Sequence, residues 1–452
     1  METMFTGAAL CAVGAEKVVS NEIRKMGLPV IDGGYGRVRF KTGLAGLYRA
    51  LMGLRAADRV LLETARFPAE DFDALFEGTR NVPWEAYIPR GMGLTVTKVR
   101  TNRSRLTAET SVQAVVHKAA AGRICERLRL ARLPELGKRA DLRVYIEKDL
   151  VSLLLDVSGA PLFKRGYRVE GGAAPLRETT AAALLLLANW RRKYPLWDPL
   201  CGAGTIVIEA ALYAWDMAPG LGRSFAVQDM LLADPKAEQA VREELLARVD
   251  FNRTIRIYGS DADERALAFA NANLRRAYGL AEGKAVPPLG AKPRGFQEGA
   301  RRLRREERGP GLPLPEGPGS GPGLPDVRPA ALEDAGKGWP PRGPYQSRRP
   351  GAAEGRRETT GEGRKPEGKE RAGEPQGFII TNPPYGIRLG DTGAAEAVYR
   401  SMAEVSRKFP GWKLGIITDH PGFESHFGKK ADACKEITNG AIRSYFYQYE
   451  PW

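Results

Sequence analysis

The sequence FIITNPPYG at residues 378–386 constrains the fold of this chain more than any other stretch. Phe378, Ile379 and Ile380 are apolar and predict a short buried strand. Two prolines follow almost at once, and they end the strand because each lacks an N–H and has a fixed φ. The result is a stiff turn at the carboxyl end of a strand, which is where open α/β sheets bind their ligands.

The turn itself supplies the candidate catalytic residues Asn382, Pro383, Pro384 and Tyr385. An asparagine amide can donate and accept hydrogen bonds at the same time. Tyr385 offers a flat face on which a planar base can stack. The four residues therefore predict a clamp for an exocyclic amine on a nucleobase. The alternative is a plain Pro-Pro turn with a solvent-facing tyrosine.

The length and charge of the chain predict several domains and a polyanionic partner. At 452 residues, of which 43% are hydrophobic, two or three domains with real cores are expected. The net charge of +15 favours nucleic acid over a membrane surface. The alternative is a charge excess that serves solubility alone.

Cysteine and histidine usage predicts neither a disulfide framework nor a metal centre. The four cysteines are far apart and form no CxxC pair, and the chain has three histidines. No apolar run approaches 18 residues, and the first residues lack a basic start followed by an apolar core. We therefore expect a soluble, cytoplasmic protein.

Two small α/β units are expected at 1–60 and 61–158. In the second unit, basic side chains gather between a strand at 94–99 and a long helix at 107–129. They are interspersed with hydroxyl and amide side chains, a mixture that suits contacts to phosphates and 2′-hydroxyls, although a solvated loop is the alternative. The basic residues are Lys98, Arg100, Arg103, Arg105 and Lys118.

A glycine turn between a strand and a helix marks the start of a third unit, in WDPLCGAGT at 197–205. Gly202 and Gly204 let the backbone approach a ligand closely, and the helix that follows supplies free N–H groups. The pattern is neither GxGxxG nor a P-loop. Asp198, directly before the turn, suits a positively charged or amine-bearing ligand.

A second acidic position follows the strand expected at 255–258. Asp261 at the end of that strand can hold both ribose hydroxyls of a nucleoside. The alternative is that Asp261 caps the helix expected at 264–278, a role that Asp263 could fill equally well.

The stretch 283–376 differs in composition from the rest of the chain. It holds 16 of the 32 prolines and 19 glycines, and its 19 Lys/Arg against 13 Asp/Glu leave a charge of +6. Such a composition cannot bury a core, so we predict a disordered, low-complexity insertion within the third unit.

Three blocks together resemble the THUMP-domain RNA guanine-N2 methyltransferases. They are DPLCGAGTIVIEAAL, GSDADERALAFANAN and TNPPYGIRLG, which begin at Asp198, Gly259 and Thr381. The segments LFKRGYR, PLRETTAAALL and NGAIRSYFYQYEP are similar to the lead-in and terminal segments of that family. The unit at 61–158 resembles the THUMP RNA-binding domain, preceded by a small ferredoxin-like piece. Within that family, the chain is similar to the bacterial enzymes that methylate a guanine of 23S ribosomal RNA.

The resemblance implies an α/β fold with a Rossmann-like class I methyltransferase domain at 159–452 that uses S-adenosylmethionine (SAM) and no metal. Asn382 and Pro383 would accept hydrogen bonds from the target amine, with Pro384 in the same turn and Tyr385 stacking on the flipped base. Positioning of the amine would carry most of the catalysis. The cofactor set that the resemblance implies is Asp198, Pro199, Cys201, Gly202, Gly204, Thr205, Asp261 and Asn382.

The chain departs from the family at a few positions. Phe163 stands where the family usually has histidine, and Ala203 stands where it has serine. The acidic residue that contacts adenine normally follows the second helix, where the insertion obscures it. Candidates for that acidic contact are Asp326, Glu333 and Asp334.

Other functions stay open at this point. They are methylation of a guanine in transfer RNA, methylation of adenine N6 in DNA, and a non-catalytic role in ribosome assembly. The basic N-terminal unit favours RNA over DNA, and the intact set of Asp198, Gly202, Gly204, Asp261 and Asn382 favours an enzyme.

Overall fold

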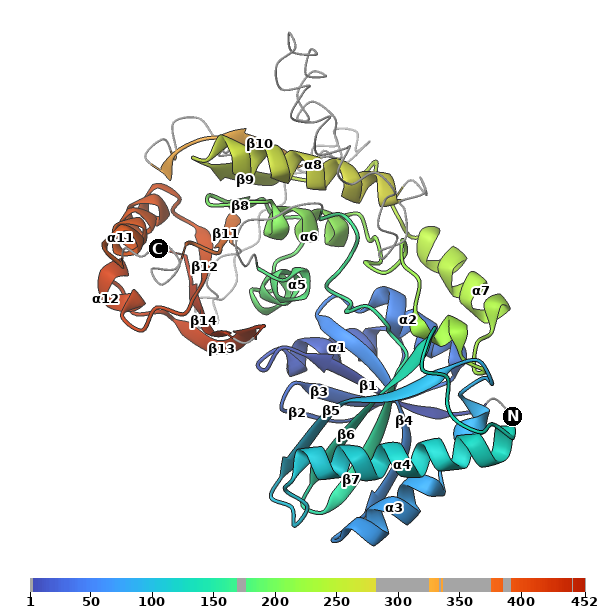
Figure 1. Ribbon diagram of the computed structural model, residues 1–452. Coiled ribbons are helices and arrows are strands. Elements are labelled where there is room, and N and C mark those ends of the chain that lie inside the picture. Colours follow the sequence, from blue (N-terminus) through green and yellow to red (C-terminus); the bar gives the residue numbers. More distant parts are fainter. Residues whose placement is uncertain are drawn as a thin grey trace, which may run out of the picture.

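The computed structural model describes residues 3–168, 176–281, 325–332, 335, 375–384, 392–440 and 442–451. Within these residues the chain forms two seven-stranded sheets, one in each half of the molecule (Figure 1).

The first sheet has the strand order β2-β3-β1-β4-β7-β6-β5. Its strands are β1 (Phe5–Cys11), β2 (Val30–Gly34), β3 (Arg37–Thr42), β4 (Ala57–Pro68), β5 (Gly93–Asn102), β6 (Arg139–Glu147) and β7 (Leu150–Asp156). β4 pairs with β1 on one side and with β7 on the other. The strand β4 therefore joins the units expected at 1–60 and 61–158 into one continuous sheet, and the division into two domains stays a prediction.

Helices cover one face of this sheet: α1 (Glu16–Lys25), α2 (Leu44–Gly53), α3 (Phe72–Arg80) and α4 (Glu109–Leu128), with a 3-10 turn η1 at Trp84–Ala86. Side chains alternate between the two faces of a strand. Ala9, Val60 and Leu62 point into the main core with the helices, whereas Ala8 and Leu61 belong to a separate small cluster. Among the described residues, the face with that small cluster carries no helix (Figure 1).

The second sheet has the order β10-β9-β8-β11-β12-β14-β13. Its strands are β8 (Leu196–Asp198), β9 (Ile257–Asp261), β10 (Asp326–Pro329), β11 (Gly377–Thr381), β12 (Trp412–Thr418), β13 (Ala433–Asn439) and β14 (Ile442–Tyr449). β8 is parallel to β9 on one side and to β11 on the other, and β14 runs antiparallel to β12. The strand order reverses at β8, and ligands bind at such switch points in open α/β sheets.

Helices cover both faces of the second sheet (Figure 1). They are α5 (Glu178–Leu187), α6 (Thr205–Ala214), α8 (Glu264–Ala281), α11 (Thr392–Lys408) and α12 (Phe423–Phe427). The helix α7 (Pro235–Leu246) packs instead against α2 of the first half (Figure 1), and a 3-10 turn η2 lies at Ala226–Asp229. Leu196 and Ile380 pack in the core that contains α5, α6 and α8. Trp197 and Ile379, the neighbouring positions on the same strands, pack with α11 and α12. This is the doubly wound arrangement that the resemblance implied.

Three elements differ from the sequence analysis. β10 lies inside the stretch predicted as a disordered insertion, so that prediction is wrong for Asp326–Pro329, which pair with β9 and bury Val327. α7 and β13 were not expected. The signal for α7 was present, since Asp234 caps the helix and Pro235 occupies its first turn.

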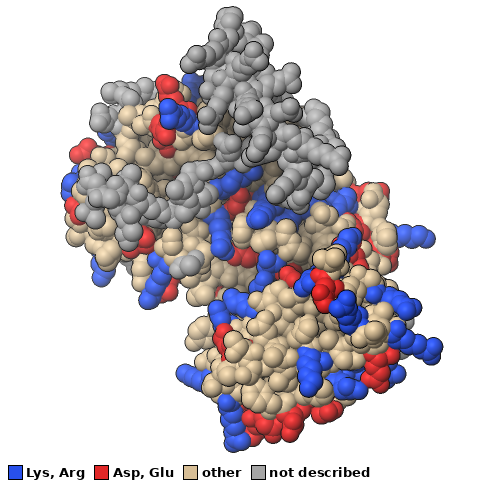
Figure 2. All heavy atoms as spheres, viewed as in Figure 1, with Lys and Arg blue, Asp and Glu red and all other residues tan. Residues whose placement is uncertain are grey.

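The two halves meet through a buried polar junction. The Arg165 side chain, 3% exposed, donates to the Arg55 carbonyl in the first half and pairs with Glu209 on α6 at 3.5 Å. Backbone amides also cross the junction, since Thr438 N donates to Val13 O. Figure 2 shows many Lys and Arg side chains along the junction on the face in view. No helix in the described part of the chain is long and apolar enough to span a membrane.

Candidate active site

The carboxyl ends of β8, β9 and β11 meet at one edge of the second sheet. They bring Asp198, Asp261 and Thr381 to that edge, because the three strands are parallel neighbours. Thr381 Oγ1 donates to Asp198 Oδ1 at 2.7 Å. This bond joins the predicted cofactor turn to the predicted catalytic turn.

Asp198 is a buried carboxylate, 2% exposed, that accepts from Thr381 Oγ1 and from Leu200 N. Burial raises its pKa from 3.8 to about 7, against the lowering effect of those hydrogen bonds. Such a group ionises readily when a positive charge arrives beside it. Its environment therefore suits a cationic ligand group, and the binding of such a group by Asp198 stays a prediction.

The glycine turn has the backbone that a close ligand approach needs. Gly202 and Gly204 have φ values of 51° and 81°, and a Cβ on Gly202 would meet no atom within 4 Å. A Cβ on Gly204 would lie 3.0 Å from the Ala270 side chain, so this glycine also permits the packing of α6 on α8. The open space at Gly202, beside two carboxylates and the N-terminus of α6, fits a cofactor that carries both a cationic group and ribose hydroxyls.

Asp261 and Asp263 have different roles, which resolves one alternative left by the sequence. Asp263 Oδ1 accepts from Arg265 N at 2.9 Å, so Asp263 caps the start of α8. Asp261 accepts from Gly202 N at 2.9 Å and from Asp263 N at 3.0 Å. Asp261 thus holds the glycine turn rather than the helix, and its contact with ribose stays a prediction.

Three further predicted cofactor residues lie in or beside this turn, whereas Asn382 lies in the turn after β11. Cys201 is buried, and desolvation together with Asp198 and Asp261 raises its pKa well above the usual value, so the thiol stays protonated. Pro199 accepts a hydrogen bond at its carbonyl from Ser260. The Thr205 hydroxyl, at the first residue of α6, accepts from Arg168 Nη2 at 2.9 Å.

The catalytic turn follows β11 directly. Asn382 is half-buried, Pro383 is buried and Pro384 is exposed. Tyr385, the predicted stacking residue, lies outside the described residues. The roles of the four residues stay predictions.

Of the candidates for the acidic adenine contact, Asp326 lies at the opposite end of its strand from the site. β10 runs parallel to β9 with Asp326 level with Tyr258 and Pro329 level with Asp261, so Asp326 is at the amino end. Its carboxylate pairs with Arg328 at 2.8 Å. Glu333 and Asp334 follow the carboxyl end of β10, but they lie outside the described residues.

The basic residues expected to form one patch in the first half are separated by the fold. Arg105 pairs with Glu70 at 2.6 Å, and Lys118 is exposed on α4, in the helical layer. Lys98 and Arg100 lie on β5 and line a cavity on the other face of the sheet.

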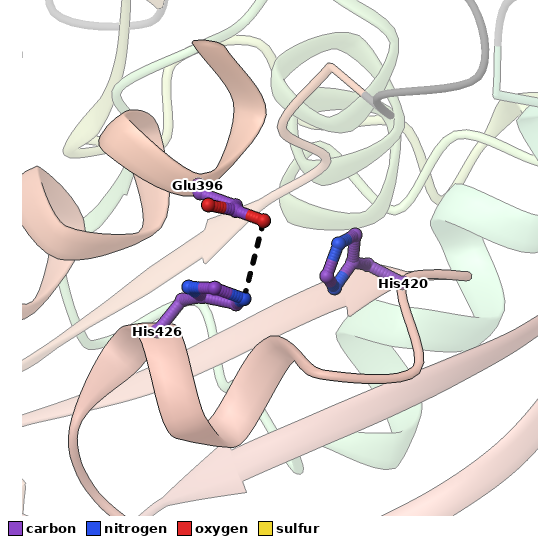
Figure 3. A group of neighbouring side chains, drawn as sticks. All are labelled: Glu396, His420 and His426. Carbon is purple, nitrogen blue, oxygen red and sulfur yellow. Dashed lines mark ion pairs between the residues drawn. The ribbon is translucent and has the colours of Figure 1, made fainter. Parts of the chain in front are cut away.

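A cluster that the sequence analysis did not anticipate lies beyond β12, where Glu396, His420 and His426 converge (Figure 3). One potential ligand atom of each lies within 4.8 Å of the others, and His426 Nε2 is 3.4 Å from Glu396 Oε1. His420 Nδ1 accepts from Gly422 N, so the neutral ring carries its proton on Nε2. Metal binding through Nε2 would move that proton to Nδ1, which could then no longer accept the hydrogen bond from Gly422 N. The expectation that the protein needs no metal stays a prediction.

Comparison with known proteins agrees with this geometry. A family model described as "RMKL-like, methyltransferase domain" matches residues 165–283 and 369–447, and one described as "RlmL ferredoxin-like domain" matches 6–61. The interruption of the first match coincides with the stretch predicted as an insertion.

Similar proteins include one named "Putative RNA methyltransferase YpsC" from Bacillus subtilis, which is 29% identical over 98% of this chain and 96% of that protein. The ribosomal RNA large subunit methyltransferase K/L of Syntrophotalea carbinolica is 30% identical over 97% of this chain. The chain spans about half the length of that relative, at 52%. The solved structure of SMU.472, a putative methyltransferase complexed with SAH, has a TM-score of 0.74 at 29% identity and covers 100% of this chain and 99% of its own.

The fold and the site define a SAM-dependent methyltransferase. More narrowly, residues 165–283 and 369–447 match an RMKL-like methyltransferase domain, and residues 6–61 match the RlmL type of ferredoxin-like domain.

Proposed function

We propose that this protein methylates the exocyclic N2 amine of a guanine in structured RNA, with large-subunit ribosomal RNA as the substrate. The observation that carries the proposal is the hydrogen bond between Thr381 and Asp198. It couples the turn that would receive the target amine to the turn that would receive the cofactor.

In this proposal each turn has a separate task. Asp198 and the glycine turn bind the cationic part of SAM, and Asp261 binds the ribose hydroxyls. The sulfonium of SAM supplies an activated methyl group when it is bound. Asn382 and the Pro383 carbonyl accept hydrogen bonds from the amine, which holds the nitrogen lone pair toward the methyl group and lowers the barrier chiefly by positioning.

Two observations support RNA as the substrate. The first half presents strand-borne Arg and Lys side chains around a large cavity, as expected for a polyanionic partner. The names of the relatives refer to RNA and to large-subunit ribosomal RNA. Transfer RNA remains the second candidate, because the same amine chemistry applies to any exposed guanine.

Methyl transfer from radiolabelled SAM tests the proposal. We expect label in an unmodified 23S ribosomal RNA transcript and at least tenfold less in transfer RNA or plasmid DNA. Label in transfer RNA alone would move the proposal to the second candidate. Label in DNA alone would show an adenine or other DNA methyltransferase, and SAM binding without transfer to any of the three would indicate an assembly factor.

A further inference from the structure

A cavity of about 950 Å³ opens on the face of the first sheet that carries no helix among the described residues. Eight of its lining residues are Lys or Arg, and three are Asp or Glu. The basic residues come from β3, β4, β5 and β6 and from Arg177, which caps α5 in the second half. None of the predicted cofactor or catalytic residues lines it.

Three buried guanidinium nitrogens around this cavity have no hydrogen-bond acceptor among the described residues. They are Arg37 Nη1, Arg39 Nε and Arg143 Nε. A buried donor left unpaired is costly, and native structures rarely leave several together. Arg39 is 7% exposed and is held in place by Asp32 at 2.6 Å and Glu63 at 2.8 Å, so its free donor has a fixed direction.

The cavity also concentrates positive charge. Burial lowers the pKa of Lys98, and the neighbouring Arg100 and Arg143 lower it further. Like charges held together at this cost are expected where an anion binds, because the anion relieves their repulsion. Five of the eight cations pair with carboxylates, whereas Arg37, Arg66 and Lys98 form no ion pair among the described residues. These three lie on three different strands, so the array fits a polyanion rather than a single phosphate.

Aromatic rings lie among these cations. The Arg37 guanidinium lies over the Tyr145 ring at 5.2 Å, and the Arg177 guanidinium lies over the Phe163 ring at 4.7 Å. Flat rings and guanidinium planes provide stacking surfaces for unpaired bases. Phe163, the departure from the family's usual histidine, therefore has a place in this cavity.

One wall of the cavity continues into the cofactor turn. Arg177 is followed by Glu178, whose carboxylate pairs with Arg168 at 2.9 Å. Arg168 also donates to Thr205, the first residue of α6 after the glycine turn. A nucleic-acid strand that contacted Arg177 would therefore be linked, through Glu178 and Arg168, to the helix start at Thr205.

We propose that this cavity binds the phosphates of a single-stranded segment of the RNA substrate and directs the target nucleotide toward the catalytic edge. The proposal rests on the proposed function and deepens it. The sequence places the RNA contacts in the loop at 100–105 and on the helix that forms α4, whereas this proposal places the main contacts on the uncovered face of the sheet.

The test compares two triple variants that remove the same charge. The cavity variant is Arg37→Gln/Arg66→Gln/Lys98→Gln. The control variant is Lys25→Gln/Lys118→Gln/Arg129→Gln, whose residues are exposed on or beside the helices of the opposite face. The measurements are binding of a fluorescent single-stranded RNA oligonucleotide over a range of salt, KM and kcat for a 23S ribosomal RNA transcript, SAM affinity, and Tm.

We expect the cavity variant to bind RNA at least tenfold more weakly and to raise KM to the same extent, with kcat at saturating RNA within about twofold. Its salt slope should fall by about 2, since each phosphate contact on a single strand contributes about 0.7. Tm should stay level or rise, because cationic repulsion is relieved, and SAM affinity should not change. The control variant should match the wild type.

An equal loss of RNA affinity in the two variants, or no loss in either, would overturn the cavity as the RNA site. The proposed function would still stand in that case if the wild type methylated the RNA. If the cavity variant loses its fold, the single variant Lys98→Gln takes its place, with Lys118→Gln as its control. We expect Lys98→Gln to bind RNA at least threefold more weakly than Lys118→Gln does. A wild type that binds SAM but neither binds nor methylates RNA would refute the proposed function itself.

Discussion

At the scale of single residues, the proposed cofactor site depends most on the side chain of Asp198. It is buried, it has a pKa near 7, and Thr381 ties it to the catalytic turn. Its charge state in the free protein therefore changes within the pH range in which cells work, and a cationic ligand shifts the balance toward the ionised form.

The pH dependence of SAM affinity should report this group. Because the pKa of Asp198 lies near 7 in the folded protein, SAM binding should tighten by up to about tenfold per unit from pH 5.5 to 7 and then level off. Calorimetry in buffers of different ionisation enthalpy should show proton release at pH 6. In Asp198→Asn, which cannot ionise, binding should be weaker and lack this step; an unchanged step would assign it to another group.

The raised pKa of Asp198 also predicts that folding stability in the absence of SAM falls with rising pH, whereas SAM affinity rises. Burial raises the folded pKa from the ordinary 3.8 to about 7, so the unfolded chain releases this proton at lower pH than the folded chain. The contribution of Asp198 to stability therefore falls as pH rises from 3.8 to about 7 and then levels off. In the absence of SAM, Asp198→Asn should therefore gain more in Tm over the wild type at pH 8 than at pH 5. An equal Tm difference at the two values would contradict the assignment.

Asn382→Ala should separate binding from chemistry. The amide would meet the target amine while SAM occupies the glycine turn, so SAM affinity should change less than twofold. Loss of that contact in a dry site should cost about 3 kcal/mol, or roughly a hundredfold in kcat. Asn252→Ala, at an exposed asparagine, is the control, and retention of more than half the wild-type transfer by Asn382→Ala would refute the role.

Asp261→Ala should act in the reverse way. Loss of charge-assisted bonds worth about 1.5–3 kcal/mol should raise the SAM dissociation constant at least tenfold. Asp263→Ala removes the cap of α8 instead, so it should lower Tm with SAM affinity unchanged. The roles would be exchanged if Asp263→Ala weakened SAM and Asp261→Ala did not.

At the scale of elements, the sequence predicts best where the signal is local. The strand, glycine turn and helix around Gly202 form where WDPLCGAGT predicts them, because apolar residues, positive-φ glycines and a helix start lie in direct succession. β10 was missed because four residues, DVRP, lie among prolines and glycines and are specified by pairing with β9 rather than by their own pattern.

Two deletions test the importance of β10. Replacing 287–320 with a short Gly/Ser link keeps β10 and should leave Tm and SAM affinity unchanged, since the cost of loop closure varies slowly with length. Replacing 287–375 also removes β10, which exposes the edge of β9 and removes the bond from Ala330 N to Asp261 O. That variant should have a lower Tm and bind SAM at least tenfold more weakly.

Equal behaviour of the two deletions would show that β10 contributes nothing to the site. A lost fold in the shorter deletion would refute the view that 287–320 is dispensable.

At the scale of the whole molecule, buried polar contacts join the two halves, and no sequence pattern predicts them. Arg165 lies in LFKRGYR, which as a sequence is a basic connector, yet its side chain is 3% exposed and reaches both Arg55 and Glu209. Likewise, β1 and β4 belong to one sheet although about fifty residues separate them in the sequence, and single-sequence patterns do not reveal such pairing.

Arg165→Met should therefore destabilise the entire chain. It leaves Glu209 buried without its ion-pair partner, at a cost of about 3–5 kcal/mol in the free energy of unfolding. Adding Glu209→Gln should restore a large part of the loss, whereas Arg248→Met, which removes an exposed pair with Asp216, should change stability by less than about 1 kcal/mol. A loss below 1 kcal/mol for Arg165→Met would contradict this view of the junction.

The central claim is that this chain transfers a methyl group from SAM to the N2 amine of guanine in ribosomal RNA. The most direct measurement is mass-spectrometric nucleoside analysis of ribosomal RNA from cells with and without the protein, and of the RNA from the deficient cells after incubation with pure protein and SAM. We predict one N2-methylguanosine that is lost with the protein and restored by it, but not by Asn382→Ala. An unchanged content of N2-methylguanosine in ribosomal RNA, with no gain after incubation, would contradict the claim.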